Sequence, residues 1–120
     1  AVERRGADIG RMYVERLLDP ESNMCFGMGG AGTWSDGKLT TRIGANGAEV
    51  RGVLRTLVAL GAPPEIMQQG KPHLGTDRMI KVLRAMRRAL EAAGVELRYG
   101  RRVESLVVRG GRCAGVRLEG

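Results

Sequence analysis

The chain has 120 residues, 42% of them hydrophobic and 28% charged, which is typical of a globular sequence with one core. Its formal net charge of +7 favours an anionic partner, either nucleic acid or a ligand with a pyrophosphate group. Two cysteines without a CxxC spacing argue against a zinc site and a disulfide framework, and no apolar run approaches the ~20 residues that span a membrane.

Both ends of the sequence have the pattern of an interrupted structure. Ala1–Glu3 are typical of the end of a strand, and the last residues, from Arg117 to Gly120, stop within an alternating pattern. We therefore expect residues 1–120 to be an internal part of one larger domain.

The first half of the chain predicts a short helix and then a long loop. Apolar residues at helical spacing indicate a helix that ends at Asp19-Pro20, namely Ile9, Met12, Tyr13 and Leu17. From Glu21 to Asp36 the periodicity disappears and glycine dominates, which predicts a loop too long for a simple connection. Lys38–Ile43 are expected to form a short strand.

Two helices are predicted in the second half. A capping box of Asn46 and Glu49 precedes a helix whose apolar face runs from Val50 to Val58, and a helical turn follows near Glu65–Gln69. A longer helix is expected from an N-cap at Thr76 to a C-cap at Gly94. Its inward residues are Met79, Ile80, Leu83, Met86 and Leu90, and its solvated face carries Arg84, Arg87 and Arg88.

After Gly94 the apolar period changes to two, as in strands. The three runs are Val95–Tyr99, Val103–Val108 and Cys113–Leu118, and Gly110-Gly111 is placed for a tight hairpin turn. The fold class is therefore α/β, with an antiparallel β-meander at the C-terminal end.

The glycine-rich loop contains fragments of several nucleotide-binding motifs, and each lacks its context. Gly27, Gly29 and Gly32 spell GxGxxG, but no buried strand precedes them and no helix start follows. Gly32–Lys38 spell GxxxxGK, but Leu39 stands where a P-loop needs the hydroxyl that binds Mg²⁺. The alternatives are an ordinary surface loop and a loop whose exposed backbone and polar side chains approach an anion or a flavin ring.

Longer runs in and after this loop resemble a family of bacterial and plastid FAD-dependent dehydrogenases with a glutathione-reductase-like fold. The resemblance rests on ordered matches along nearly the whole chain, in Asp19-Pro20-Glu21-Ser22-Asn23, Phe26-Gly27, Gly29–Thr33, Ser35–Leu39, Gly61-Ala62-Pro63, Lys71-Pro72-His73 and Gly75-Thr76-Asp77. It implies an incomplete FAD/NAD(P)-binding, Rossmann-like domain. The GxGxxG strand-helix unit of that domain and its C-terminal part lie outside this chain, which should not hold FAD alone.

The resemblance also implies roles for individual residues. Glu3 and Arg4 correspond to the segment that contacts the adenosine ribose, although Glu3-Arg4-Arg5-Gly6 has one residue more than the usual pattern, and Val103 corresponds to a backbone contact with the adenine. The flavin side is expected in the glycine-rich loop, at Gly29, Gly30, Ala31, Gly32, Thr33, Ser35, Asp36, Gly37, Lys38 and Leu39. Cys25 is expected to be a buried, unreactive thiol.

His73 is the only histidine and the candidate catalytic residue, because an imidazole can donate a proton beside a reduced flavin. The sequence thus predicts part of an FAD-dependent oxidoreductase with an unassigned small-molecule substrate, NAD(P)H as a candidate electron donor and no metal. The expected compartment is the cytoplasm or the plastid stroma. The alternative is a small basic nucleic-acid-binding module, which the wide separation of Tyr13, Phe26, Trp34 and Tyr99 disfavours.

Overall fold

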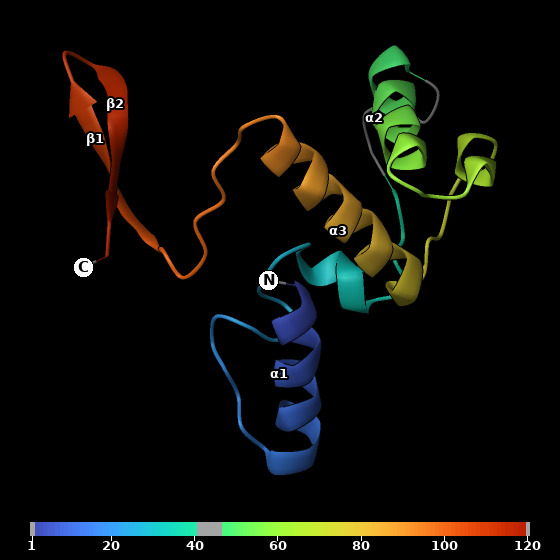
Figure 1. Ribbon diagram of the computed structural model, residues 1–120, viewed down its shortest axis with the longest axis horizontal. Helices are drawn as coiled ribbons and strands as arrows, with labels where there is room; N and C mark the ends of the chain where they lie inside the picture. Colours follow the sequence, from blue (N-terminus) through green and yellow to red (C-terminus); the bar gives the residue numbers. More distant parts are fainter. Residues whose placement is uncertain (1, 41–46, 120) are drawn as a thin grey trace.

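The computed structural model describes residues 2–40 and 47–119, which form a small α/β protein of helices and one antiparallel hairpin (Figure 1). In chain order the elements are α1 (Val2–Glu15), the 3-10 turn η1 (Ala31–Trp34), α2 (Ala48–Ala59), the 3-10 turn η2 (Pro64–Met67), α3 (Thr76–Ala92), β1 (Val103–Arg109) and β2 (Arg112–Leu118). The α/β class is confirmed at this level.

The hydrophobic core lies where α2, η2 and α3 meet. Its buried members are Ala62, Ile66, Leu74 and Val82. Side chains of α2 and the N-terminal part of α3 pack around it, which confirms the two predicted helices. Their starts differ from the prediction: Gly75 rather than Thr76 caps α3, and Gly47 caps α2, while Asn46 of the expected capping box lies outside the described residues.

Helix α1 starts earlier than the sequence predicts. Val2 and Glu3 lie in the helix rather than in a strand. Its buried residues, Val2, Arg5, Asp8 and Ile9, recur at helical spacing, but two of the four are charged. The prediction of its face was wrong because it counted apolar residues only, and the more distant Tyr13 and Leu17 are more than half exposed.

A hairpin replaces the expected meander. Gly110 and Gly111 have φ angles of 56° and 74°, as the predicted tight turn between β1 and β2 requires. Val95–Tyr99 form no strand; they cross from α3 to the hairpin without a pairing partner among the described residues. The hairpin stands apart from the helices in Figure 1, and Val103 at the start of β1 is 51% exposed.

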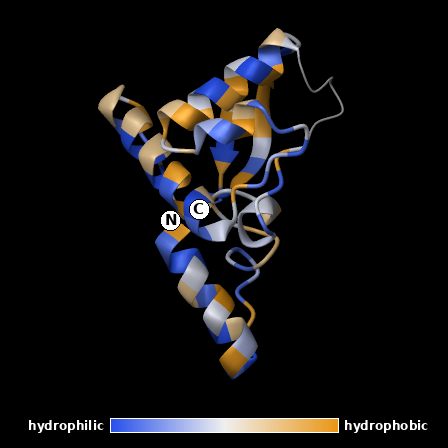
Figure 2. Ribbon diagram, turned by 90° about the vertical axis from the view of Figure 1, so that its right-hand side faces the viewer, coloured by the Kyte–Doolittle hydropathy of each residue, from blue (hydrophilic) through white to orange (hydrophobic). Residues whose placement is uncertain are grey.

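The buried core is small for the length of the chain. The radius of gyration is 17.0 Å, against about 14 Å for a compact domain of this size. Hydrophobic residues occur all along the helices and the hairpin (Figure 2), and many stay exposed, among them Val53, Leu106, Val108 and Val116. Within the described residues, no helix has the length and apolar character needed to cross a membrane.

Candidate functional site

The glycine-rich loop wraps around the side chain of Arg5, which is 1% exposed. The planar face of the guanidinium lies 4.7 Å from the centre of the Trp34 ring. Its N–H groups donate hydrogen bonds to five loop carbonyl oxygens, those of Asn23 (2.8 Å), Met24 (3.0 Å), Gly27 (3.3 Å), Met28 (3.0 Å) and Gly30 (2.8 Å). A single charged side chain from α1 therefore fixes the path of the loop from Asn23 to Gly30.

Asn23 closes the turn at the start of this loop. Its side-chain oxygen accepts hydrogen bonds from the N–H groups of Cys25 (2.9 Å) and Phe26 (3.1 Å), and its amide nitrogen donates to the carbonyl of Asp19 at 2.8 Å. The hydroxyl of Ser22 donates to the buried carboxylate of Asp8 at 2.6 Å, which ties the same turn to α1. The loop is thus held at two points along the helix.

Two glycines in the loop leave no room for a side chain. A Cβ atom on Gly27 would lie 2.6 Å from Cδ of Arg5, and one on Gly29 would lie 2.3 Å from Oγ1 of Thr33. Both glycines also have positive φ angles, of 118° and 94°. A Cβ atom on Gly30, by contrast, would have no atom within 4 Å, so the loop is tight toward α1 at Gly27, tight toward Thr33 and α3 at Gly29, and open at Gly30.

Polar groups of the loop remain without partners among the described residues. The N–H groups of Gly27, Met28 and Gly29 have no acceptor there, and the buried hydroxyl of Thr33 makes no hydrogen bond. A buried polar group such as the Thr33 hydroxyl is normally paired with protein, water or a ligand, whereas Gly27 and Gly29 are exposed, so their N–H groups are open to solvent or to a ligand. The loop therefore has its carbonyls satisfied by Arg5 and several donors available for an acceptor.

The residues after the loop pair with a distant segment of the chain. The N–H of Leu39 donates to the carbonyl of Pro72 (2.9 Å), and that of Leu74 donates to the carbonyl of Gly37 (3.0 Å). Lys38 and His73 form the antiparallel bridge between these segments. Of the strand predicted at Lys38–Ile43 only this bridge is described, since residues 41–43 lie outside the described part.

The bridge creates a polar cluster of Asp36, Lys38 and His73. Oδ2 of Asp36 lies 3.3 Å from Nζ of Lys38 and 3.7 Å from Nδ1 of His73. All three side chains are about half exposed. A carboxylate between an ammonium group and an imidazole can orient both, so this arrangement is suited to holding an anion and exchanging a proton.

Glu3 and Arg4 lie on α1, and both make contacts outside the cluster of Asp36, Lys38 and His73. Glu3 accepts hydrogen bonds from Nε of Arg84 (3.0 Å) and Nη1 of Arg87 (3.3 Å) of α3. A hydrogen bond from its own backbone N–H, followed by the charges of these arginines, lowers the pKa of Glu3. Arg84 and Arg87, predicted on a solvated face, therefore also join α3 to α1 while their side chains stay partly exposed.

Arg4 instead reaches a groove beside the loop. Its side chain lies 3.2 Å from Asp19 and lines a cleft of about 250 Å³ with Gly27, Met28 and Tyr99. The adjoining cleft, of about 510 Å³, shares Glu21 and Gly100 with the first and is otherwise lined by Arg101, Arg102 and Glu119.

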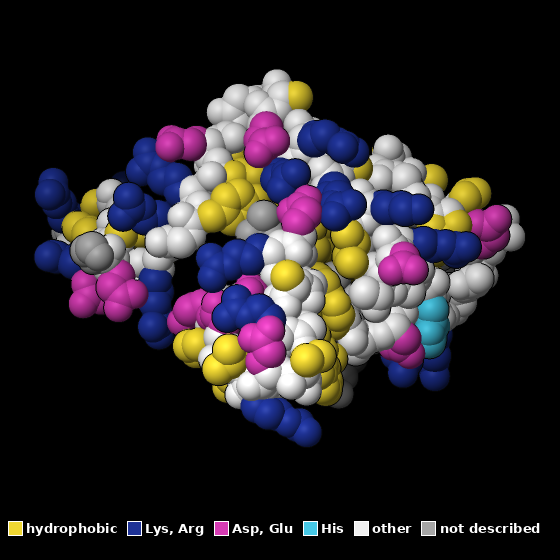
Figure 3. Space-filling view, turned by 60° about the horizontal axis from the view of Figure 1, so that its bottom comes forward, with side chains coloured by type: hydrophobic (Ala, Val, Ile, Leu, Met, Phe, Trp, Pro, Cys, Tyr) yellow, Lys and Arg dark blue, Asp and Glu magenta, His cyan; other side chains and the backbone are white. Residues whose placement is uncertain are grey.

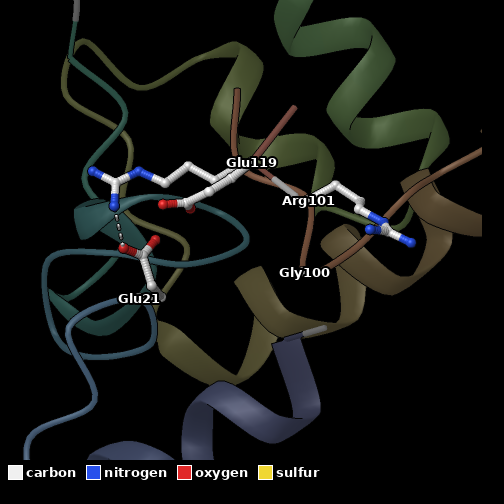
Figure 4. Close-up of a pocket in the computed structure, with 5 residues that line it drawn as sticks. Glu21, Gly100, Arg101 and Glu119 are labelled. Atoms are coloured by element: carbon white, nitrogen blue, oxygen red, sulfur yellow. Dashed lines mark ion pairs between the residues drawn. The ribbon is translucent and has the colours of Figure 1, made fainter. Parts of the chain in front are cut away.

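Figure 4 shows the larger cleft with the ion pair between Arg102 and Glu21, whose nearest atoms lie 3.6 Å apart. The side chain of Arg101 points away from Glu21 in this view. Val103 follows Arg102 at the start of β1, so the groove runs from Arg4 toward the hairpin.

The structure thus brings one part of the predicted site together in space. It brings Asp36–Leu39 close to His73 through the bridge, whereas Glu3, Arg4 and Val103 lie outside that cluster. Sequence reasoning missed Arg5, whose spacing from Val2 and Ile9 on one helix face was a usable signal. Cys25 was expected to be buried, but it is exposed, because Asn23 and Arg5 bind the backbone around it and leave the thiol outside.

The chain is similar to a longer bacterial protein. The chain is 34% identical over 119 residues to a protein of Clostridium beijerinckii described as "Uncharacterized protein", a match that covers 99% of this chain. The chain spans about a fifth of the length of that relative (22%). No protein-family model matches the sequence. Among the described residues, no group of three or more metal-binding side chains is present.

Proposed function

We propose that this chain contributes the flavin-facing loop of an FAD-dependent oxidoreductase with a Rossmann-like cofactor domain. The observation that carries the proposal is the loop itself: its carbonyls are bound by Arg5, its N–H groups at Gly27–Gly29 are unpaired among the described residues, and Gly30 is open. Unpaired backbone donors and glycines without a Cβ fit a planar ring with electronegative edge atoms that approaches the backbone closely.

The loop residues would hold the cofactor, and the polar cluster would serve the reaction. FAD supplies the electron transfer when it is bound. Lys38 offers a positive charge toward an anionic group, Asp36 orients its two neighbours, and His73 is placed to give or take a proton. The proposal assigns cofactor contacts to Gly29–Thr33 and Ser35–Leu39, and proton transfer to His73.

The adenosine side of the cofactor is a separate element of the proposal. Glu3, Arg4 and Val103 would contact the ribose and adenine, and Arg4 already lines the groove that leads toward the hairpin. Because Glu3 is paired with Arg84 and Arg87, a ribose hydroxyl would have to share its carboxylate with them. Because the chain spans about a fifth of the length of its relative, FAD binding is proposed for the longest natural form of the protein.

Gly32→Val tests this proposal. A Cβ added at Gly32 would have no atom within 4 Å and the residue has no positive φ, so the valine side chain starts into open space and should disturb the fold little. If FAD lies against the loop, the variant should lose the flavin absorbance that copurifies with the wild type. Gly52→Val in α2 is the matched control, since its surroundings are equally open. Absence of flavin from the wild type, or equal occupancy in both variants, would contradict the proposal.

No specific observation on the described residues favours nucleic-acid binding as the alternative function. On the face in Figure 3, lysine and arginine side chains alternate with aspartate and glutamate rather than forming a continuous basic surface. Many arginines are in ion pairs, including Arg4, Arg11, Arg84 and Arg87. Pairing of this kind lowers the local positive potential that phosphate backbones require.

A further inference from the structure

The burial of Arg5 is unusual because its charge is matched by carbonyl oxygens rather than by a carboxylate. The residue is 1% exposed, and no acidic side chain among the described residues pairs with it. Burial lowers the pKa of the guanidinium and the nearby Cys25 raises it, and arginine stays charged in proteins. A permanently charged group in this position is stable only while the loop carbonyls surround it.

The contacts of Arg5 follow the shape of the guanidinium. Nε binds the carbonyl of Asn23, Nη2 binds that of Met24, and Nη1 alone reaches three carbonyls farther along the loop. A lysine ammonium is a single point of charge on a flexible stem and cannot reach both ends of this set. The loop conformation therefore depends on a planar guanidinium group, with donors in several directions, at this position.

Because of the orientation of the peptide groups, the contacts of Arg5 also determine which backbone groups of the loop are available to a ligand. When the carbonyls of Gly27 and Met28 point to Arg5, the N–H groups of Met28 and Gly29, which belong to the same peptide units, are directed away from it because the amide is planar and trans. These are N–H groups that have no acceptor among the described residues.

We propose that Arg5 is a positioning residue that locks Asn23–Gly30 with the N–H groups of Met28 and Gly29 turned outward, ready for an electron-rich ligand. That this ligand is the flavin of FAD rests on the proposed function above. The proposal that Arg5 locks the loop does not rest on that function, since the lock follows from the contacts of Arg5 alone.

Hydrogen exchange of the loop, measured in the longest natural form without added flavin, tests the lock. In Arg5→Met, exchange at the bonded amides of Asn23, Cys25, Phe26 and Gly30 should rise about tenfold or more, since several charge-assisted hydrogen bonds are lost together. Arg5→Lys should give an intermediate rise. Exchange in α2 should stay unchanged in both variants, and Arg11→Met on the same helix is the control for losing a surface arginine.

Titration of the same variants with FAD, followed by flavin fluorescence, tests the consequence. We expect weakening by about tenfold or more in Arg5→Met and partial recovery in Arg5→Lys. Loop exchange equal to wild type, or an equal rise in every helix, would overturn the lock, because a merely structural role loosens the whole fold. A loosened loop with unchanged FAD affinity would overturn the positioning role. Failure of the wild type to bind FAD would remove the proposed function and leave the exchange result standing.

Discussion

Nδ1 of His73 lies 3.7 Å from Oδ2 of Asp36, across an antiparallel bridge that joins two segments far apart in the sequence. The hydrogen bonds on either side of the bridge fix the backbone, so the two side chains remain neighbours even though each is half exposed. A carboxylate at this distance favours one orientation of the imidazole ring. The pair is therefore the part of the polar cluster best suited to proton transfer.

His73→Gln should leave flavin binding intact and slow turnover by ~10² to 10⁴, the range for a lost general acid or base. Flavin reduction by a candidate donor, or its reoxidation by a surrogate acceptor, can be followed by stopped-flow absorbance.

Asp36→Asn separates orientation from proton transfer. It keeps the shape of the side chain and removes its charge, so it should give a smaller loss of rate than His73→Gln. If the rate of His73→Gln stays within about twofold of the wild type at every pH, His73 belongs to the scaffold.

The predictable parts of this fold are those in which local spacing decides the structure. The period of α3 and the glycine pair at the hairpin turn are visible in the sequence because each depends on residues within one element. A search for apolar helix faces does not identify Arg5 as a buried residue, since its charged side chain interrupts the apolar pattern of the helix face on which it lies. The bridge between Lys38 and His73 is a long-range pairing of two single residues, which leaves no periodic signal.

Glu3 should make the attachment of α1 to α3 dependent on pH. Its pKa is lowered below the ordinary value of 4.5, so the ionised carboxylate is favoured in the folded state. Stability from the pairs with Arg84 and Arg87 is then present above pH 4.5 and is lost as the pH falls through the lower, folded-state pKa. We expect the urea midpoint to fall in this acid range in the wild type and less in Glu3→Gln.

The control for this measurement is Glu91→Gln. Glu91 lies on α3 and makes no ion pair among the described residues, so its loss should leave the acid transition in place. Equal acid transitions in Glu3→Gln and the wild type would mean that the contact between α1 and α3 does not depend on the carboxylate. Raised salt should weaken the effect of Glu3 at neutral pH, because the pair is partly exposed to solvent.

Gly29 and Gly30 are a matched pair of positions whose substitution tests whether the loop packs against α3. Both have positive φ angles, of 94° and 70°, and Gly30 has a ψ angle of −176°, so alanine carries a backbone cost of ~1 to 3 kcal/mol at either position. Only at Gly29 would the new Cβ meet side chains, at 2.3 Å from Oγ1 of Thr33 and 2.4 Å from Cδ1 of Leu83. Overpacking of this kind adds ~1 to 3 kcal/mol.

Gly29→Ala should therefore lower the free energy of unfolding by ~1 to 3 kcal/mol more than Gly30→Ala does, as measured by urea unfolding. Thr33 is buried and cannot move aside freely, whereas Leu83 ends in a flexible side chain. The double variant Gly29→Ala/Leu83→Ala should consequently be less destabilised than the sum of its two single variants, because the cavity left at Leu83 accepts the added methyl group. Equal losses for Gly29→Ala and Gly30→Ala, or strict additivity in the double variant, would show that the loop does not pack on α3 at this point.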